Sequence, residues 1–444
     1  MNSAASQWYS QCLQSSGSSA VTTSAPATTR TTTSSVVITT PRTTTAAITT
    51  AATTTLRTTT TAAAVASGLA FPGAEGFGRI AIGGRNGGTV YEVTNLNDSG
   101  AGSLRDAVSK SNRLVVFKVG GTITIDTRIV VSPSIYIAGQ TAPGGGITVY
   151  GNGFSFSNAH NSIVRYIRIR MGKGGDSGKD GITIAEGRNM IFDHVSAAWG
   201  RDETFSISGT AVNITVQNSI IAQGLETHSC GGLMETDGGI SLFRNLYIDN
   251  KTRNPKVKGV NDFTNNVVYN WGGGGGYIAG DSAGTSFANI INNYFISGPS
   301  TSVTAFTRGN ANFHGYVSNN FYDSNRDGTL NGAALCVSTT CYSNMVIEPT
   351  KYDYPAPARL LSAADAVAHV IANVGNTFPS RDGIDDRLIS ELKSFGKTGQ
   401  LISDEKASPM NGPGTTTPGT SSVSYAWSYA AVEAYVNSLV PSGY

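Results

Sequence analysis

The stretch NMIFDHVSAAW at residues 189–199 is the first of six similar segments that follow one another along the chain. The others are NITVQNSIIAQ (213–223), ISLFRNLYIDN (240–250), DFTNNVVYNW (262–271), ANIINNYFIS (288–297) and GYVSNNFYDS (315–324). Each contains a short β-prone run, and five share an asparagine at a matching position: Asn218, Asn245, Asn266, Asn293 and Asn320, separated by 27, 21, 27 and 27 residues. His194 occupies this position in the first segment. A repeat of this length with one β-rich unit indicates a stacked solenoid.

We expect an all-β fold, a parallel β-helix, because each repeat offers short strands joined by turns. A leucine-rich horseshoe is the alternative solenoid, but its regular leucine pattern is missing. Asparagines stacked at a turn can hydrogen-bond to one another and to the backbone groups that stacking buries. We therefore predict a structural role for these asparagines, and also for His194.

The composition fits a turn-rich extracellular protein. Of the 444 residues only 14% are charged, against roughly 25% in typical globular domains, and 53 are glycine. The formal net charge of +2 argues against a nucleic-acid binder, which would need a basic face. No apolar run has the length of a membrane span. Cys336 and Cys341 are close enough to form a disulfide, Cys230 is expected to be a buried thiol, and Cys12 has no nearby partner.

The N-terminal region has a different character. SQWYSQCLQ within residues 1–16 resembles the last strand of a fungal-type cellulose-binding module, of which only this remnant is present; the alternative is a leader without function. Residues 17–66 are rich in Thr, Ser and Ala, which predicts a disordered, O-glycosylated linker. No secretory signal opens the chain, so we interpret its start as truncated in a protein that is otherwise secreted.

The folded part is expected to have two regions. Residues 67–349 form the β-helix, and GSLRDAVSKS near its start predicts a short helix capped by Ser103. Residues 350–444 form a C-terminal extension in which SAADAVAHVIANV, RLISELKSFG and SYAAVEAYVNSLV have helical spacing. These helices are expected to cap the end of the solenoid or to pack on its side.

Two motifs carry a family resemblance. GKDGITIAEGRNMIFDH (178–194) and RNPKVKG (253–259) resemble polysaccharide lyase family one, the pectate and pectin lyases, and so do FPGAEGFG, VTNLNDSG, GQTAPG, WGRDETFSI and GLETHSCGG. In that family an aspartate precedes a hydrophobic-Asp-His motif by thirteen residues, as Asp180 precedes Asp193 here, and an Arg-x-Pro-x-x-basic motif follows, here at Arg253 to Lys258. The resemblance covers residues 71–345 and implies a right-handed parallel β-helix with a C-terminal helical cap.

The resemblance also implies a reaction. A secreted, monomeric fungal pectate lyase would cleave (1→4)-α-D-galacturonan of the plant cell wall by β-elimination and release 4,5-unsaturated oligogalacturonides. Ca²⁺ would neutralise the substrate carboxylate and stabilise the anion that forms. The resemblance assigns the base to Arg253 and calcium ligands to Asp180 and Asp202. Arginine is an unusual base, but like charges on Lys251, Lys256 and Lys258 disfavour its ionisation, which implies an alkaline optimum.

The remaining site residues follow from the departures from the family pattern. A second acidic ligand is replaced by Ser206, for which Glu203 would compensate, although strict strand alternation turns Glu203 to the other face. A substrate-binding lysine aligns with Thr227, beside His228. We expect substrate to be bound by Lys256, Lys258, Arg201 and His228.

Two alternatives for the function stay open. Arg201 near the calcium ligands is a feature of pectin lyases, which act on methyl esters without metal. A non-catalytic carbohydrate-binding solenoid would keep the cleft without turnover.

A second calcium loop and three glycosylation sites are further candidates. DSNRDGTLNGAA, which begins at Asp323, matches the first seven positions of an EF-hand loop, with Asp323, Asn325, Asp327 and Thr329 as ligands, but it lacks the closing glutamate and flanking helices. An Asn-Asp-Gly-rich hairpin would have the same sequence. Asn97, Asn213 and Asn250 begin Asn-x-Ser/Thr sequons, and Asn250 is expected to stay unmodified because it lies three residues from Arg253.

Overall fold

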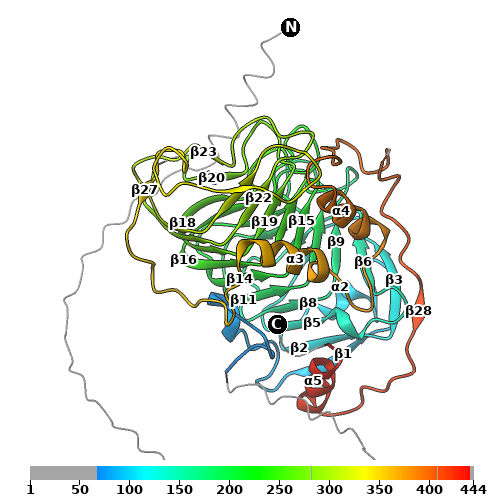
Figure 1. Cartoon of the computed structure of the whole chain (residues 1–444). Helices are drawn as coiled ribbons and strands as arrows, with labels where there is room; N and C mark the ends of the chain where they lie inside the picture. Colours follow the sequence, from blue (N-terminus) through cyan, green and yellow to red (C-terminus); the bar gives the residue numbers. More distant parts are fainter. Residues whose placement is uncertain (1–67, 282, 408, 441–444) are drawn as a thin grey trace, which may run out of the picture. The chain divides into compact units, whose positions relative to one another are not determined.

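The structure, a computed structural model, describes residues 68–281, 283–407 and 409–440. Within them the chain winds into a parallel β-helix, as the repeat predicted (Figure 1). The cellulose-binding remnant at 1–16, the linker at 17–66 and Cys12 lie outside the described residues.

Three parallel ribbons of strands run along the solenoid. The first ribbon consists of β1 (Thr89–Val93), β2 (Arg113–Phe117), β5 (Ile135–Ala138), β8 (Ile163–Arg165), β11 (Arg188–Asp193), β14 (Val212–Gln217), β16 (Leu233–Phe243), β18 (Lys256–Thr264), β21 (Ser286–Ile291), β24 (Phe313–Ser318) and β27 (Val346–Ile347). The second consists of β4 (Ile129–Val130), β7 (Phe154–Ser155), β10 (Ile182–Ile184), β13 (Phe205–Ile207), the first halves of β16 and β18, β20 (Tyr277–Ala279) and β23 (Phe306–Thr307).

The third ribbon is extended by short antiparallel strands. It contains β3 (Val119–Thr124), β6 (Ile147–Tyr150), β9 (Arg168–Arg170), β12 (Ser196–Ala198), β15 (Ile220–Ala222), β17 (Leu246–Ile248), β19 (Val267–Tyr269), β22 (Tyr294–Ile296) and β25 (Phe321–Asp323). The antiparallel additions are β26 (Ala333–Ala334), which pairs with β25, and β28 (Gly419–Thr420), which pairs with β3.

The core is a set of columns in which equivalent side chains of successive coils stack. On the first ribbon one fully buried column is formed by Phe192, Val216, Leu242, Phe263 and Ile290. Successive residues of a strand point to opposite faces, so the neighbours of these residues face away from the core. The short apolar runs of the sequence therefore repeat because each coil must fill the same interior positions.

The asparagine ladder confirms the predicted structural role and corrects its register. The backbone N–H of each ladder residue donates to the side chain of the next: Ser219 to Asn245 at 2.9 Å, Asn245 to Asn266 at 2.9 Å, Asn266 to Asn293 at 2.8 Å and Asn293 to Asn320 at 3.0 Å. Ser219, not Asn218, therefore occupies the ladder position in its coil, because Gln217 pairs with Phe243.

Asn218 belongs to the adjacent column, where the chain turns the corner. Its strand register aligns it with His194, Arg244 and Asn265, and all four have a positive φ between 49° and 61°. Asparagine tolerates this left-handed conformation better than most residues. Two neighbouring columns thus favour asparagine for different reasons, one for its amide and the other for its backbone.

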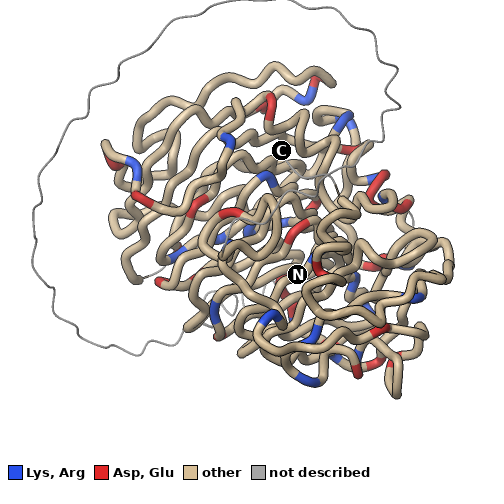
Figure 2. Tube along the Cα trace, turned by 90° about the horizontal axis from the view of Figure 1, so that it is seen from below, with Lys and Arg blue, Asp and Glu red and all other residues tan. Residues whose placement is uncertain are grey.

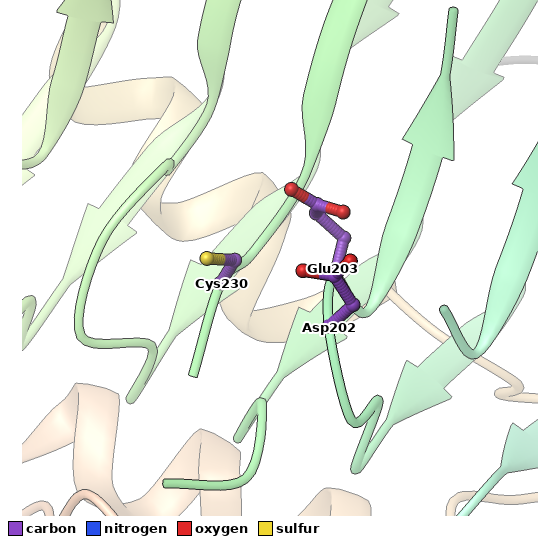
Figure 3. A group of neighbouring side chains, drawn as sticks. All are labelled: Asp202, Glu203 and Cys230. Atoms are coloured by element: carbon purple, nitrogen blue, oxygen red, sulfur yellow. The ribbon is translucent and has the colours of Figure 1, made fainter. Parts of the chain in front are cut away.

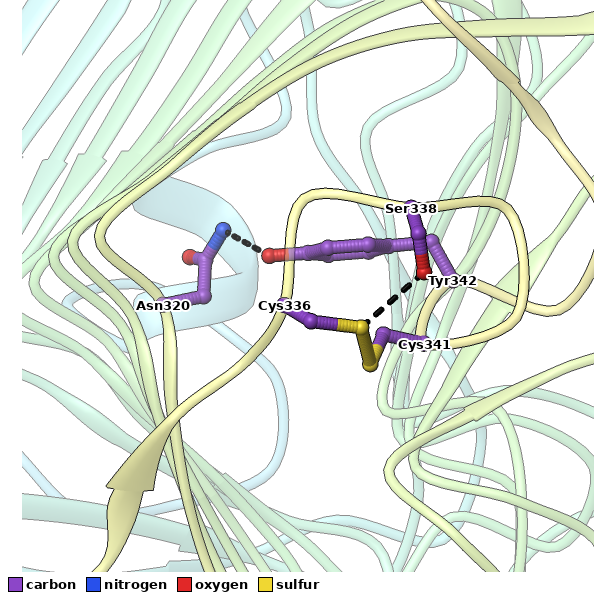
Figure 4. Close-up of a disulfide and its surroundings, with 5 residues drawn as sticks. All are labelled: Asn320, Cys336, Ser338, Cys341 and Tyr342. Carbon is purple, nitrogen blue, oxygen red and sulfur yellow. Dashed lines mark hydrogen bonds between the residues drawn. A yellow bond between two sulfur atoms is a disulfide. The ribbon is translucent and has the colours of Figure 1, made fainter.

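A disulfide loop lies at the last ladder residue (Figure 4). Asn320 donates to the hydroxyl of the buried Tyr342 at 3.0 Å, and Tyr342 directly follows Cys341. Cys336 and Cys341 form the expected disulfide. The loop therefore supplies the last asparagine amide with a hydrogen-bond acceptor where no further coil continues the ladder.

The helices of the C-terminal extension lie along the flanks of the solenoid, the second of the two expected arrangements. α3 (Ala363–Asn373) and α4 (Gly383–Lys393) pack apolar side chains against the third ribbon, and α5 (Tyr429–Ser438) packs against the first coil beside β1 (Figure 1). The short helices are η1 (Phe77–Ile80), η2 (Gly139–Thr141) and α2 (Leu104–Ala107), whose predicted cap Ser103 accepts from the N–H of Asp106 at 3.2 Å.

Candidate active site

Two adjacent coils of the second ribbon present the predicted acidic residues. Asp180 lies just before β10, and Asp202 and Glu203 lie just before β13. One carboxylate oxygen of Asp180 accepts the hydroxyl of Thr183 at 2.8 Å, and the other accepts the N–H of Glu203 at 3.2 Å. These bonds fix the Asp180 side chain against the neighbouring coil.

The carboxylates are close enough to repel one another. Burial raises the pKa of Asp180 to about 6, and the negative charge of Asp202 acts in the same direction. The guanidinium of Arg128 donates to the backbone carbonyl of Asp180 at 2.8 Å. A bound cation would relieve the repulsion between these negatively charged carboxylates, and carboxylate oxygens are the ligands that Ca²⁺ prefers. The donor set therefore fits the ion that the sequence predicted.

Glu203 faces Asp202, contrary to the doubt raised by strand alternation. It precedes β13 and forms only an isolated bridge to Cys230, so the alternation of a regular strand does not apply. A carboxylate oxygen of Asp202, one of Glu203 and the sulfur of Cys230 all lie within 4.8 Å of one another. Figure 3 shows the three side chains on neighbouring segments of the chain.

Arg253 lies next to these acids. It precedes β18, its side chain is largely buried, and its guanidinium donates to a carboxylate oxygen of Glu203 in an ion pair. Its φ of 56° is left-handed, which is uncommon for arginine and marks a tightly determined turn. The structure thus brings together Arg253, Asp180, Asp202 and Glu203, which are up to 73 residues apart in sequence.

The lysines around Arg253 do not form an unpaired cationic cluster. Lys251 pairs with Glu226 at 3.0 Å, Lys256 lies 3.6 Å from Asp281, and Lys258 pairs with Glu235 at 2.5 Å. Burial lowers the pKa of Lys256; Asp281 opposes this effect, and the charges of Arg253 and Lys258 add to it. The positive charge that stands out in the sequence is therefore largely balanced by acids from other coils. In keeping with this, both signs of charge are interspersed along the trace (Figure 2).

The other two predicted substrate-binding residues have partners at the site. The guanidinium of Arg201 donates to the carbonyl of Gly175 at 2.6 Å, which ties it to the loop before β10. His228 Nδ1 lies 2.8 Å from Asp202, and both side chains are about one-third exposed. Ser206 lies on β13 in register with Thr183, so it faces the same side as the acids but supplies a hydroxyl instead of a carboxylate.

The hydrophobic-Asp-His motif is structural. Asp193 is buried and pairs with the buried Arg165 at 2.8 Å, and His194 stacks on Tyr166. Although burial raises the pKa of Asp193, His194 and Arg165 hold it well below its usual range. Asp193 is the last residue of β11 and His194 lies at the corner that follows, away from the acids of the second ribbon. This supports the structural role predicted for His194.

The second calcium candidate forms a hairpin. Asp323 ends β25, which pairs with β26 in antiparallel fashion, so the loop between them joins strands and not helices. Within the loop Asn325 accepts the N–H of Asp327 at 3.0 Å, and Asp327 accepts the N–H of Thr329 at 2.8 Å. Asp323 accepts the N–H of Asn331 at 3.1 Å. These bonds use the proposed ligand oxygens to shape a turn, which favours the hairpin interpretation.

The three sequons differ in access. Asn97 is exposed and Asn213 is half-buried, whereas Asn250 is fully buried. The Asn250 amide donates to the carbonyl of Ile221 and to Asn254, both at 3.0 Å, so a glycan would have to break both bonds. Burial is thus a stronger reason for an unmodified Asn250 than its distance from Arg253.

Sequence reasoning missed two residues at this site. Cys230 was interpreted only as a buried thiol, and Asp281 was not singled out as a partner of Lys256. Cys230 lies in the segment GLETHSCGG, but that resemblance gave it no role, and no motif marks Asp281. Each reaches the site through lateral stacking of coils. The bridges from Cys230 to Glu203 and to Thr252 set this placement.

Comparison with known proteins gives consistent relatives. "Probable pectate lyase C" of Aspergillus fumigatus is 65% identical over 402 residues, covering 85% of this chain and 95% of the relative. The protein of the same name in Emericella nidulans is 65% identical over 405 residues, covering 85% and 94%. No protein-family model matches the chain.

Solved structures share the fold at low identity. A Bacillus sp. N165 pectate lyase, determined in complex with trigalacturonate, aligns with a TM-score of 0.51 and 18% identity and covers 69% of this chain and 99% of that one. A pectate lyase of Acidovorax avenae subsp. citrulli also aligns with a TM-score of 0.51, at 12% identity, covering 69% and 95%.

Proposed function

Because the chain belongs to the pectate lyase family, we propose that it cleaves (1→4)-α-D-galacturonan, the de-esterified form of pectin, by calcium-assisted β-elimination. The products would be 4,5-unsaturated oligogalacturonides. The observation that carries this proposal is the placement of the buried Arg253 against Glu203, beside Asp180 and Asp202.

Asp180, Asp202 and Glu203 would hold the calcium ion. Their oxygens come from adjacent coils and carry more negative charge than Arg253 balances, which suits a hard divalent cation. When bound, the ion would neutralise a substrate carboxylate and so ease formation of the anion at C5.

Arg253 is the proposed base. The reaction removes the proton at C5 and expels the oxygen linked at C4 of the same sugar residue, so the base must lie within reach of the C5 proton. Glu203 holds the guanidinium beside the proposed calcium ligands, and burial leaves it little freedom to turn away. A positioned group of this kind typically contributes 10²–10⁴-fold to the rate.

Lys256, Lys258, Arg201 and His228 are proposed to bind the polymer. The two lysines alternate along β18 with the buried Val257 between them, so both face the outer side of the second ribbon. Their ammonium groups already contact acids, so a polyanion would compete with Asp281 and Glu235 for them.

We also propose that the protein is secreted and acts as a monomer on plant cell-wall pectin. The Cys336–Cys341 disulfide suits an oxidising compartment. Among the described helices, none combines the length and apolar character needed to cross a bilayer.

The test compares two substrates with and without a calcium chelator. Polygalacturonate and highly methylated pectin are incubated with the full chain, and the unsaturated product is followed by its ultraviolet absorbance. Release from polygalacturonate that the chelator abolishes is expected. Chelator-resistant release from the methyl ester would instead indicate a pectin lyase, a function that the names of the relatives do not support.

A further inference from the structure

The thiol of Cys230 lies among the acids of the active site, and the proposed reaction does not use it. Cys230 is fully buried, and its sulfur, one carboxylate oxygen of Asp202 and one of Glu203 all lie within 4.8 Å of one another. Figure 3 shows Cys230 on the segment next to the one that carries the two acids. Its backbone is paired on both sides, through bridges to Glu203 and Thr252, so the position of the sulfur is set by the solenoid. Within the described residues this is the one group of three His, Cys, Asp or Glu side chains whose ligand atoms all lie within 4.8 Å of one another.

The mixture of donors separates this group from a calcium site. Calcium is bound by oxygen and gains little from sulfur. Zinc binds thiolate and carboxylate together, accepts three protein ligands in an open site and prefers sulfur and nitrogen donors to oxygen alone. A buried cysteine usually packs as a small apolar residue, but the sulfur of this one lies within 4.8 Å of two carboxylate oxygens, and it donates to the carbonyl of His228 at 3.8 Å.

We propose that Cys230, Asp202 and Glu203 form a site for Zn²⁺ or a similar borderline metal ion, and that occupation of this site inhibits the enzyme. Binding converts the Cys230 thiol to a thiolate and releases its proton to solvent. His228, whose Nδ1 lies 2.8 Å from Asp202, would orient the Asp202 ligand in the manner of an outer hydrogen-bond partner.

Inhibition follows because two of the three donors are shared. Asp202 and Glu203 are proposed calcium ligands, and Glu203 also holds Arg253. A zinc ion on these oxygens therefore excludes calcium. The inhibitory part of the inference rests on the proposed lyase function, whereas zinc binding itself does not.

The binding experiment uses the full chain without substrate. Calorimetric titration with Zn²⁺ and with Ca²⁺ is compared for the wild type, Cys230→Ser and the surface control Asp353→Asn. The wild type is expected to bind Zn²⁺ at least about tenfold more tightly than Cys230→Ser does, while their Ca²⁺ affinities differ by less than about threefold. Asp353→Asn, on an exposed loop, should match the wild type for both ions.

A spectroscopic arm reports the sulfur ligand directly. Co²⁺ added in place of Zn²⁺ should give a thiolate-to-metal charge-transfer band in the wild type, and Cys230→Ser should lack it. Circular dichroism and the melting temperature establish that Cys230→Ser is folded, and Cys230→Ala serves as a second variant if serine disturbs the coil. Zn²⁺ affinity unchanged in a folded Cys230 variant, or a Co²⁺ complex without that band, would overturn the site.

The inhibition experiment separates the two proposals. With polygalacturonate and saturating Ca²⁺, added Zn²⁺ should slow the wild type, and excess Ca²⁺ should restore the rate. If Zn²⁺ binds through Cys230 but leaves turnover unchanged, the inhibitory role is wrong and the metal site stands. If no turnover occurs with Ca²⁺ alone, the proposed function fails while the calorimetric result keeps its meaning.

Discussion

The guanidinium of Arg253 is held by the carboxylate of Glu203, which lies 50 residues earlier and two coils away along the second ribbon. Cys230 lies on the coil between them and is bridged to Glu203 on one side and to Thr252 on the other. The Arg253–Glu203 ion pair therefore spans the coil that carries Cys230, and the stacking of the coils sets the positions of both residues. The proposed base is therefore in direct contact with one of the proposed calcium ligands.

Substitution of Arg253 by lysine is expected to reduce kcat by about 10²–10⁴-fold, because lysine keeps the charge but cannot place the same nitrogen at the substrate proton. The KM for polygalacturonate should change much less. Initial rates of unsaturated-product release across substrate concentrations measure both. Arg188→Lys, at an exposed position at the start of β11, is the matched control. A kcat within threefold of wild type in Arg253→Lys would remove Arg253 from the proton-transfer step.

Neutralising Asp180 or Asp202 is expected to weaken Ca²⁺ binding by about tenfold or more, because each substitution removes a charged oxygen ligand. Calorimetric titration of Asp180→Asn and Asp202→Asn without substrate measures the loss independently of turnover. Asp323→Asn tests the hairpin: its Ca²⁺ binding should equal that of the wild type, since the Asp323 oxygen accepts an N–H within the turn. A loss confined to Asp323→Asn would move the calcium site to that loop.

The sequence predicted the solenoid and singled out the acids and the arginine that the structure brings together, but not how the coils align sideways. The period of the β runs indicates that the coils stack, but it does not distinguish an asparagine of the ladder from one at the adjacent corner. Asn218 was therefore assigned one residue out of register. Asp180 and Arg253 were recognised because the family spacing marks them. Cys230 was not, since its approach to Glu203 depends on the path of a loop that carries no repeat.

Truncation of a ladder residue should destabilise the fold strongly. In Asn266→Ala the buried N–H of Asn245 loses its acceptor, and the carbonyl of Leu242 loses a donor at 2.8 Å. Each unsatisfied buried group costs about 1–3 kcal/mol, so a loss of roughly 2–4 kcal/mol in the free energy of unfolding is expected. Urea unfolding followed by circular dichroism measures it. Asn312→Ala, at an exposed position, should change stability by less than about 0.5 kcal/mol.

Buried Asp262 should make stability depend on pH. Burial raises its pKa to about 6, whereas an unfolded aspartate titrates near 3.9. The folded state therefore binds the proton more tightly. Its stabilising effect is fully present below about pH 4 and is lost as the pH rises through 6, a change of roughly 3 kcal/mol. Asp262→Asn keeps an acceptor for the Thr264 hydroxyl, which lies 2.5 Å from Asp262, and cannot ionise.

Unfolding free energies at several values between pH 4 and pH 7 test this expectation. Relative to wild type, Asp262→Asn should gain stability between about pH 4 and pH 6 and level off above pH 6, while the exposed Asp353→Asn should follow the wild-type profile. The gain arises because, above pH 4, the folded wild type must either take up a proton that the unfolded chain has released or bury a charged carboxylate. The second oxygen of that carboxylate lacks a hydrogen-bond partner in the structure. Parallel profiles for wild type and Asp262→Asn would show that Asp262 titrates alike in the folded and unfolded states.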